Sequence, residues 1–297
     1  MSWAVVVDAS DPRMEEAASW PKQVEVVEIA DAAEAGAQVG ALLRAGVEVA
    51  AVQGGDRFVA QLATVHRQQW AGHSTALRWL PLDLSEHGAA STVVAANLDA
   101  PAPERKLARR IERAIKRGKL TSRAISALRV TSSLAPTWEL AFTVGAGELL
   151  GLFEEMARSR LGYAGRIGAA LRSIDEDAVG PSGPRPPARI SLDATPHPDT
   201  AWALLSALER SWFGLPMQPR GSSGEPRALL GDSLASLAPL LARARTPLAR
   251  RDLGAARFDT AHFDMLDGYV LDGQLVEPTR PYVLQVADGH TVPMLSL

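Results

Sequence analysis

The fold is decided by one stretch of the sequence, Val47-Glu48-Val49-Ala50-Ala51-Val52-Gln53-Gly54-Gly55-Asp56. Its first six residues form a short, largely apolar run that ends at a polar residue and a glycine pair, a pattern typical of a buried strand followed by a turn. Beyond the turn, Phe58, Leu62 and Val65 recur at helical spacing. The stretch therefore predicts a strand, a glycine turn and a helix.

The residues on either side repeat this alternation of strand and helix. The predicted strands cover residues 3–7, 24–29 and 77–82. Residues 31–44 carry a helical pattern, and residues 101–119 predict a basic amphipathic helix. Strands that alternate with helices predict a parallel sheet with helices on both faces. We therefore predict an N-terminal three-layer α/β domain, with a mostly parallel sheet, over residues 1–120.

After Leu120 the pattern changes to β. Strands are predicted at residues 124–132, 138–144, 188–193, 263–271 and 282–286. A helical stretch covers residues 148–174, and loops rich in Pro, Gly and Ser cover residues 180–187 and 216–226. These patterns predict a second, β-rich, β-sandwich-like α+β domain over residues 121–297.

The composition narrows the function classes. The 297 residues are 46% hydrophobic and carry a formal net charge of −3, without the strongly basic balance typical of nucleic-acid binders. There are no cysteines, so thiol nucleophiles and disulfides are excluded. No long apolar segment indicates a membrane span or a signal peptide. We expect a cytoplasmic protein that does not bind nucleic acid; the oligomeric state is not assignable.

Four segments of the chain resemble a known family. They are Gly54-Gly55-Asp56-Arg57-Phe58, Pro81-Leu82-Asp83-Leu84-Ser85-Glu86-His87, Leu204-Leu205-Ser206-Ala207-Leu208-Glu209 with Gly214-Leu215, and Val270-Leu271-Asp272-Gly273-Gln274-Leu275. Their order and spacing resemble the diacylglycerol kinase and sphingosine kinase superfamily of lipid kinases. Because every motif is only partly kept, the resemblance is to a degenerate member.

The resemblance implies a nucleotide site at the first segment. In the family, a Gly-Gly-Asp-Gly-Thr loop lets backbone N–H groups approach the phosphates of ATP, which is bound with Mg²⁺. Gly54, Gly55 and Asp56 match this loop. Arg57 replaces the third glycine and could pair with phosphate through its charge, while Phe58 replaces the threonine.

The second segment departs further from the family pattern, which reads Pro-Leu-Gly-Thr-Gly-Asn-Asp. Asp83 and Glu86 add carboxylates where a nucleotide is expected. Two like charges about 4 Å apart cost roughly 4 kcal/mol at an effective dielectric constant of about 20. Nucleotide binding in the family manner is therefore disfavoured, and no convincing acidic cluster for magnesium is identified.

The late segment implies a catalytic base. Asp272 matches the aspartate of the family's Asp-Gly-Glu motif, and Gln274 replaces the glutamate. A carboxylate there would accept the proton of the lipid hydroxyl during phosphoryl transfer. The competing interpretations are structural: Asp272-Gly273 and Asp267-Gly268 are typical β-turn pairs, and Asp56 is suited to a helix start.

Three hypotheses follow. The first is a pseudokinase, non-catalytic or weakly active, that binds a lipid or protein partner through a cleft between the domains. The alternative is an ATP-dependent lipid kinase that phosphorylates a diacylglycerol-like hydroxyl, with Asp272 as base. The third is a structural module that pairs through an exposed sheet edge. Separately, the basic helix predicts peripheral contact with an anionic membrane.

Overall fold

The computed structural model describes residues 2–10, 20–72, 77–82, 104–135, 137–158, 185–209, 211, 215, 217–218, 224–244, 254–266, 268–277 and 282–296. The chain divides into two compact units, residues 1–125 with 291–297, and residues 126–290. Strands β5 (Thr121–Ser132) and β16 (Tyr282–Ser296) each contribute to both units. The expected boundary after Leu120 lies at the start of β5, and residues 291–297 belong with unit 1.

Unit 1 contains the predicted parallel sheet. Its strands are β1 (Ser2–Asp8), β2 (Val26–Ile29), β3 (Val47–Gln53) and β4 (Arg78–Leu82). They lie in the order β2-β1-β3-β4, all parallel, and β16 pairs in parallel with β4 through Met294 and Trp79. Strands β1, β3 and β4 are largely buried and apolar, as expected for strands covered on both faces, whereas the edge strand β2 is partly exposed.

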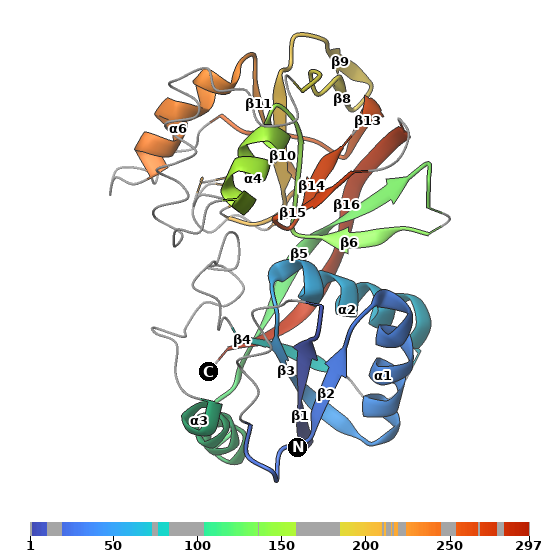
Figure 1. The fold of residues 1–297 in the computed structure, drawn as a ribbon, viewed down its shortest axis with the longest axis vertical. Helices are drawn as coiled ribbons and strands as arrows, with labels where there is room; N and C mark the ends of the chain where they lie inside the picture. The colour runs from blue at the N-terminus through green and yellow to red at the C-terminus, as the bar shows by residue number, and fades with distance from the viewer. Residues whose placement is uncertain are drawn as a thin grey trace. The chain divides into compact units, whose positions relative to one another are not determined.

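Helices cover both faces of this sheet, which makes the three predicted layers. Helices α1 (Ala32–Arg44) and α2 (Asp56–Trp70) lie on one side, and α3 (Glu104–Lys116) lies on the other (Figure 1). The core under α3 is formed by alternate strand residues and two helix residues: Val5, Val7, Val49, Ala51, Leu80, Leu82, Leu107, Ile111 and Leu295. Helix α1 begins at a side-chain cap, where Asp31 accepts a hydrogen bond of 2.8 Å from the Glu34 N–H.

Unit 2 is a sandwich of two largely antiparallel sheets. One contains part of β16 with β13 (Thr260–Leu266), β8 (Ile190–Leu192) and β9 (Thr195–His197), and β5 paired with β6 (Glu139–Ala141). The other has the order β12-β11-β10-β7-β14-β15. Its strands are β12 (Ala256–Arg257), β11 (Arg227–Gly231), β10 (Trp202–Ser206), β7 (Thr143–Gly147), β14 (Tyr269–Leu271) and β15 (Gln274–Val276).

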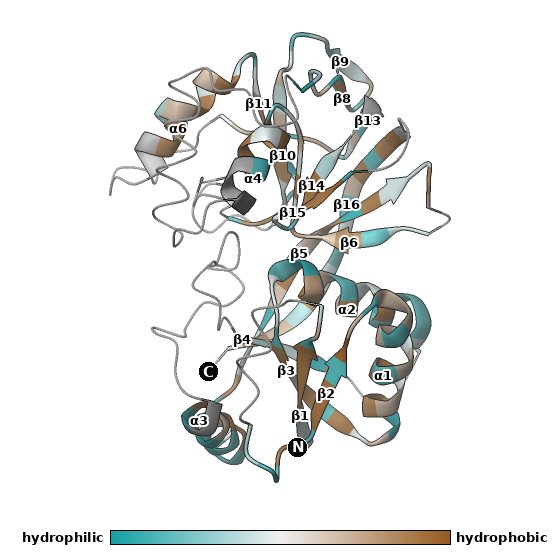
Figure 2. Cartoon of the chain, in the orientation of Figure 1, coloured by the Kyte–Doolittle hydropathy of each residue, from teal (hydrophilic) through white to brown (hydrophobic). Residues whose placement is uncertain are grey.

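Apolar side chains from both sheets meet in one core, which confirms the sandwich-like second domain. Leu128 and Phe263 come from the first sheet, and Val144, Leu205 and Leu271 from the second. Figure 2 shows brown, the colour of apolar residues, on β10 and β14, and a mixture of brown and paler colours on the other strands. The described residues of this unit also form the helices α4 (Leu149–Arg158) and α6 (Leu237–Ala244) and the short helix η3 (Leu234–Ser236).

Most of the predicted elements are present, and three strands differ clearly in extent. The stretch 138–144 is split into β6 and β7 at Phe142, and the strand predicted at 282–286 continues to Ser296. The single strand predicted at 263–271 is instead two strands, β13 and β14, which belong to different sheets. The part of the predicted helix beyond Arg158 lies outside the described residues. Among the helices that the structure describes, none has the length and apolar character needed to cross a membrane.

Candidate functional site

The candidate site lies at the carboxyl ends of β1 and β3. From β1 the chain moves to β2 on one side, and then returns to place β3 on the other side of β1. In open parallel sheets, ligands bind at the strand ends where the order reverses in this way. Val7 pairs with Gln53 in the register of these two strands, so Asp8, Gln53 and Gly54 come together at this edge.

The two glycines of the loop are there for different reasons. A Cβ on Gly54 would stand 2.6 Å from the Phe58 ring and 3.1 Å from the Cβ of Asp8, so packing requires a glycine. A Cβ on Gly55 would meet nothing within 4 Å, and its φ of −73° suits any residue. Neither sterics nor conformation requires a glycine at position 55. The absence of a side chain there leaves the backbone open to close approach by a ligand.

Helix α2 begins directly at this loop. Gly55 is its N-cap residue and supplies no side-chain hydrogen bond, in contrast to Asp31 at the start of α1. The first N–H groups of a helix lack partners within the helix and attract anions. Asp56 is buried in this first turn, so its carboxylate interacts favourably with the helix dipole and competes with a second anion. Arg57, half-buried beside it, adds a positive charge.

Phe58 changes the character of the loop. Its side chain is only 5% exposed, and the contact with Gly54 places the ring against the loop backbone. A threonine here would present a hydroxyl that can bond to phosphate, whereas the ring offers only apolar surface. The loop thus keeps the glycines that leave its backbone accessible to a ligand, but it lacks the threonine hydroxyl of the family pattern.

Gln53 and Trp20 complete the site and were not predicted from the sequence. Gln53 is 1% exposed, and its Oε1 accepts a hydrogen bond of 2.7 Å from the indole N–H of Trp20. Its Nε2 is buried and has no hydrogen-bond partner among the described residues. An unsatisfied buried donor costs about 1–3 kcal/mol, which a ligand acceptor at this edge would recover. The sequence offered one indication of Gln53: it is a polar residue at the end of an otherwise largely apolar strand.

Asp8 lies at the end of β1, next to this loop. It is buried, and its Oδ1 accepts hydrogen bonds from the N–H and the hydroxyl of Ser10, at 3.1 and 2.6 Å. Its proximity to Gly54 comes from strand register and not from the sequence neighbourhood. Sequence analysis did not select it, because nothing in the local pattern distinguishes it.

Asp272 lies in unit 2, in the two-residue turn between β14 and β15. Leu271 pairs with Gln274, and the turn residues Asp272 and Gly273 have φ of +48° and +85°. Positive φ at both central positions is the property of a type I′ hairpin turn, for which an Asp-Gly pair is favoured. The hairpin predicted from the Asp272-Gly273 pair is therefore present. Asp267 lies outside the described residues.

The Asp272 carboxylate holds the chain where β6 passes into β7. Its Oδ1 accepts hydrogen bonds from the N–H groups of Phe142 and Thr143, both at 2.8 Å. The Thr143 hydroxyl lies 3.3 Å from the same oxygen, and the Asp272 N–H donates to the Thr143 carbonyl at 3.1 Å. The side chain is only 7% exposed. Asp272 therefore has a structural role, because its hydrogen bonds connect the β14–β15 turn to the backbone between β6 and β7.

The structure thus brings Gly54, Gly55, Asp56 and Arg57 together at the β3–α2 junction of unit 1, whereas Asp272 belongs to unit 2. The acidic loop from Asp83 to His87 lies outside the described residues. Within the described part of the chain, no group of three or more His, Cys, Asp or Glu side chains is placed to hold a metal ion.

Comparisons with known proteins support the fold. No model of a known protein family matches the sequence, and no curated protein matches it. Among solved structures, the chain is similar to a putative diacylglycerol kinase from Bacillus anthracis str. Sterne, with a TM-score of 0.60 and 13% identity, covering 99% of this chain and 96% of that one. A further crystal structure with that description gives a TM-score of 0.57 at the same identity and coverage.

A yeast NADH kinase complexed with NADH is also similar, with a TM-score of 0.50 and 10% identity, covering 100% of this chain and 84% of the kinase. The resemblance to diacylglycerol kinase-like proteins is confirmed at the level of the fold. At 10–13% identity, these neighbours carry no residue roles to this chain.

Proposed function

We propose that this protein has a diacylglycerol kinase-like fold with little or no phosphoryl-transfer activity, and that it works by binding a lipid or a protein partner. The observation that carries the proposal is the engagement of Asp272, the residue in the position of the implied base. Its Oδ1 is committed to the Phe142 and Thr143 N–H groups, and the side chain is almost fully buried. A general base needs a carboxylate oxygen within hydrogen-bond reach of the substrate hydroxyl.

The β3–α2 loop supports the same proposal. Phosphoryl transfer depends on positioning the phosphates and stabilising their charge. Here the ring of Phe58 packs against Gly54, and the buried Asp56 carboxylate already occupies the first turn of α2. Both features weaken the loop as a phosphate site.

An ATP-dependent lipid kinase is the second candidate, and two observations favour it. Gly55 is a glycine that the fold itself does not require, and the buried Nε2 of Gln53 has no partner among the described residues. Both lie at the edge where ligands of parallel sheets bind. A nucleotide at this edge would use the open backbone and the unsatisfied donor.

The test is to measure ATP turnover by the full-length protein with magnesium, with and without diacylglycerol in mixed micelles, alongside calorimetric titration with Mg-ATP and Mg-ADP. We expect no turnover above the lipid-free background, whether or not the nucleotide binds. Diacylglycerol-dependent formation of a phosphorylated lipid would overturn the proposal and establish the kinase. An Arg57→Gly variant provides the comparison for any heat of binding.

The Gly55→Ala variant is expected to lose no more than about 1 kcal/mol of its free energy of unfolding, because the added methyl group meets open space at an ordinary φ and the cost comes from alanine being a poorer N-cap residue than glycine. Where Mg-ATP binding is measurable, the same change is expected to weaken it about tenfold if phosphates lie against this backbone. Denaturant unfolding and calorimetry provide the two readouts.

Gly54→Ala is the matched control, since the same methyl group would there collide with the Phe58 ring. Overpacking of this kind costs about 1–3 kcal/mol. Equal stability losses in the two variants would contradict the open space assigned to Gly55.

A further inference from the structure

Helix α3 carries a cationic stripe along the side that faces away from the sheet. Five cationic positions share this side: Arg109, Arg110, Arg113 and Arg117 lie three, four, seven and eleven residues after Lys106. At about 100° per residue they fall within an arc of about 100°. We name this set, together with Lys119, the α3 basic face; Arg117 and Lys119 lie just beyond the last helical residue, Lys116.

The opposite side of α3 is fixed in the core of unit 1. Leu107, Ala108 and Ile111 are at most 2% exposed, and Leu107 and Ile111 pack against the strands of the sheet. The helix therefore cannot turn its apolar side toward another partner without unfolding this core. Only the charged side is available for binding.

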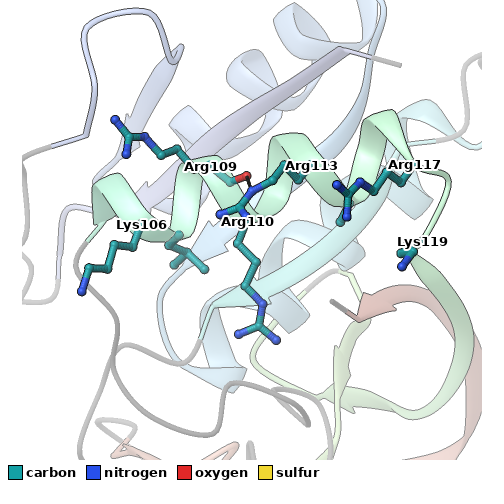
Figure 3. A pocket seen from close by; sticks show the side chains of 8 residues that line it. Lys106, Arg109, Arg110, Arg113, Arg117 and Lys119 are labelled. Carbon is teal, nitrogen blue, oxygen red and sulfur yellow. Dashed lines mark hydrogen bonds between the residues drawn. The ribbon is translucent and has the colours of Figure 1, made fainter.

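The α3 basic face borders a shallow hollow of about 540 Å³. The described residues that line it are the six cationic side chains together with Leu107 and Ala114, and none of these is acidic. Figure 3 shows the side chains of Lys106, Arg109 and Arg110 extending outward from the helix. The one hydrogen bond drawn is donated by the Arg113 Nε to the Arg109 backbone carbonyl at 3.0 Å. Because this acceptor is uncharged, the bond does not neutralise either guanidinium group.

Five of these six cationic side chains have no ion-pair partner in the described part of the chain. They are Lys106, Arg109, Arg113, Arg117 and Lys119. Like charges at a spacing of four residues destabilise a helix. A row of them on a short helix weakens the helix unless a negatively charged surface compensates.

The charge of the whole chain is strongly asymmetric. Residues 104–119 contain eight Lys and Arg and two Glu, a net charge of +6. Since the whole chain is at −3, the remainder carries −9. A negatively charged surface therefore attracts this segment, in contrast to the net negative charge of the rest of the sequence.

We propose that the α3 basic face docks the protein on the surface of an anionic phospholipid membrane. The stripe is straight and about 16 Å long at 1.5 Å per residue, which suits a flat array of phosphate headgroups. It contains no aromatic side chain on which a nucleic-acid base would stack. With the apolar side buried, the contact is electrostatic and peripheral, without insertion into the bilayer.

Helix α3 packs on the sheet face opposite α1 and α2, away from the β3–α2 junction. The membrane proposal therefore does not depend on what binds at that junction. The experiment measures co-sedimentation of the full-length protein with vesicles of phosphatidylcholine alone and with one third phosphatidylglycerol. We expect binding only to the anionic vesicles, and its loss when salt is raised from about 0.1 M to about 0.5 M, because salt screens exposed charges.

The test variant is Arg109→Gln with Arg117→Gln, and the control is Lys22→Gln with Arg67→Gln, two exposed cations elsewhere in unit 1. Each cation near an anionic membrane contributes about fivefold in affinity. We therefore expect the test pair to weaken vesicle binding about 25-fold and the control pair to leave it within about twofold. Unfolding curves of both variants confirm that the fold is intact.

Three results would overturn the inference: no binding to anionic vesicles, equal binding to vesicles of phosphatidylcholine alone, or equal losses in the two pairs of variants. A fourth arm adds a short duplex DNA at the same salt concentration. Tighter binding to the duplex than to the vesicles, lost in the test pair, would reassign the α3 basic face to nucleic acid and overturn the membrane proposal.

Discussion

The Asp272→Ala variant is expected to lose about 4 kcal/mol of its free energy of unfolding. Alanine removes the acceptor of two fully buried N–H groups, those of Phe142 and Thr143, and each unsatisfied buried donor costs about 1–3 kcal/mol. It also places a residue with a Cβ and no local hydrogen bond at a φ of +48°. Denaturant unfolding monitored by circular dichroism measures this loss.

Asp272→Asn is the matched control. An asparagine side chain keeps an oxygen that can accept from the same two N–H groups, and asparagine tolerates positive φ. We expect this variant to stay within about 1 kcal/mol of the wild type. If alanine and asparagine destabilise the protein equally, the hydrogen bonds to Phe142 and Thr143 do not hold this junction.

The same pair of variants separates structure from catalysis. A working base would be disabled by asparagine as thoroughly as by alanine, because the amide cannot accept the proton. Under the proposed function, asparagine leaves the activity at its background level. A diacylglycerol-dependent turnover that asparagine abolishes, with stability preserved, would return Asp272 to a catalytic role.

Gly147→Ala is expected to have the largest effect on stability, a loss of more than about 4 kcal/mol. Gly147 ends β7 with a φ of +71°, and a Cβ there would stand 2.1 Å from the carbonyl oxygen of Ala201 and 3.0 Å from the N atom of Ala188. Both neighbours are backbone atoms. The Ala201 carbonyl accepts from Glu148 at 3.0 Å, and the Ala188 N–H donates to Thr200 at 2.9 Å. Relief of the collision would therefore break hydrogen bonds in unit 2.

Gly46→Ala provides the comparison for this prediction. Gly46 has a similar φ of +73°, but a Cβ there would meet nothing within 4 Å. Its replacement carries only the conformational cost, about 1–2 kcal/mol. Thermal and denaturant unfolding of the two variants separate that cost from the steric collision. A Gly147→Ala protein no less stable than Gly46→Ala would mean that the backbone around β7 adjusts freely.

The sequence predicted the elements of unit 1 well because its buried strands are mostly apolar. The residues at 47–52 and 77–82 have few polar positions, so their ends are marked by the polar and glycine residues that follow. In unit 2, the predicted strand at 282–286 was too short. Asp288-Gly289 is typical of a turn, yet it lies within β16, where pairing with neighbouring strands keeps the backbone extended.

The candidate site was predicted only where it is contiguous in sequence. Gly54 to Arg57 form one motif, whereas Asp8 and Trp20 reach Gly54 and Gln53 through strand register and tertiary packing. No spacing rule in the sequence encodes such contacts. The structural role of Asp272 was predicted in part, since the Asp-Gly pair indicated the turn. Its hydrogen bonds to residues about 130 positions earlier could not be deduced from the pattern.

The division of unit 1 between two distant parts of the chain also affects how the protein is made. Residues 1–125 leave the ribosome first, but the strand that lies beside β4 is supplied by residues 291–297. Throughout the synthesis of residues 126–290, the nascent amino-terminal unit has an open edge at β4, and Leu295 is missing from its core. An unpaired edge strand can pair with other chains. We therefore expect the nascent chain to be most prone to aggregation during this interval.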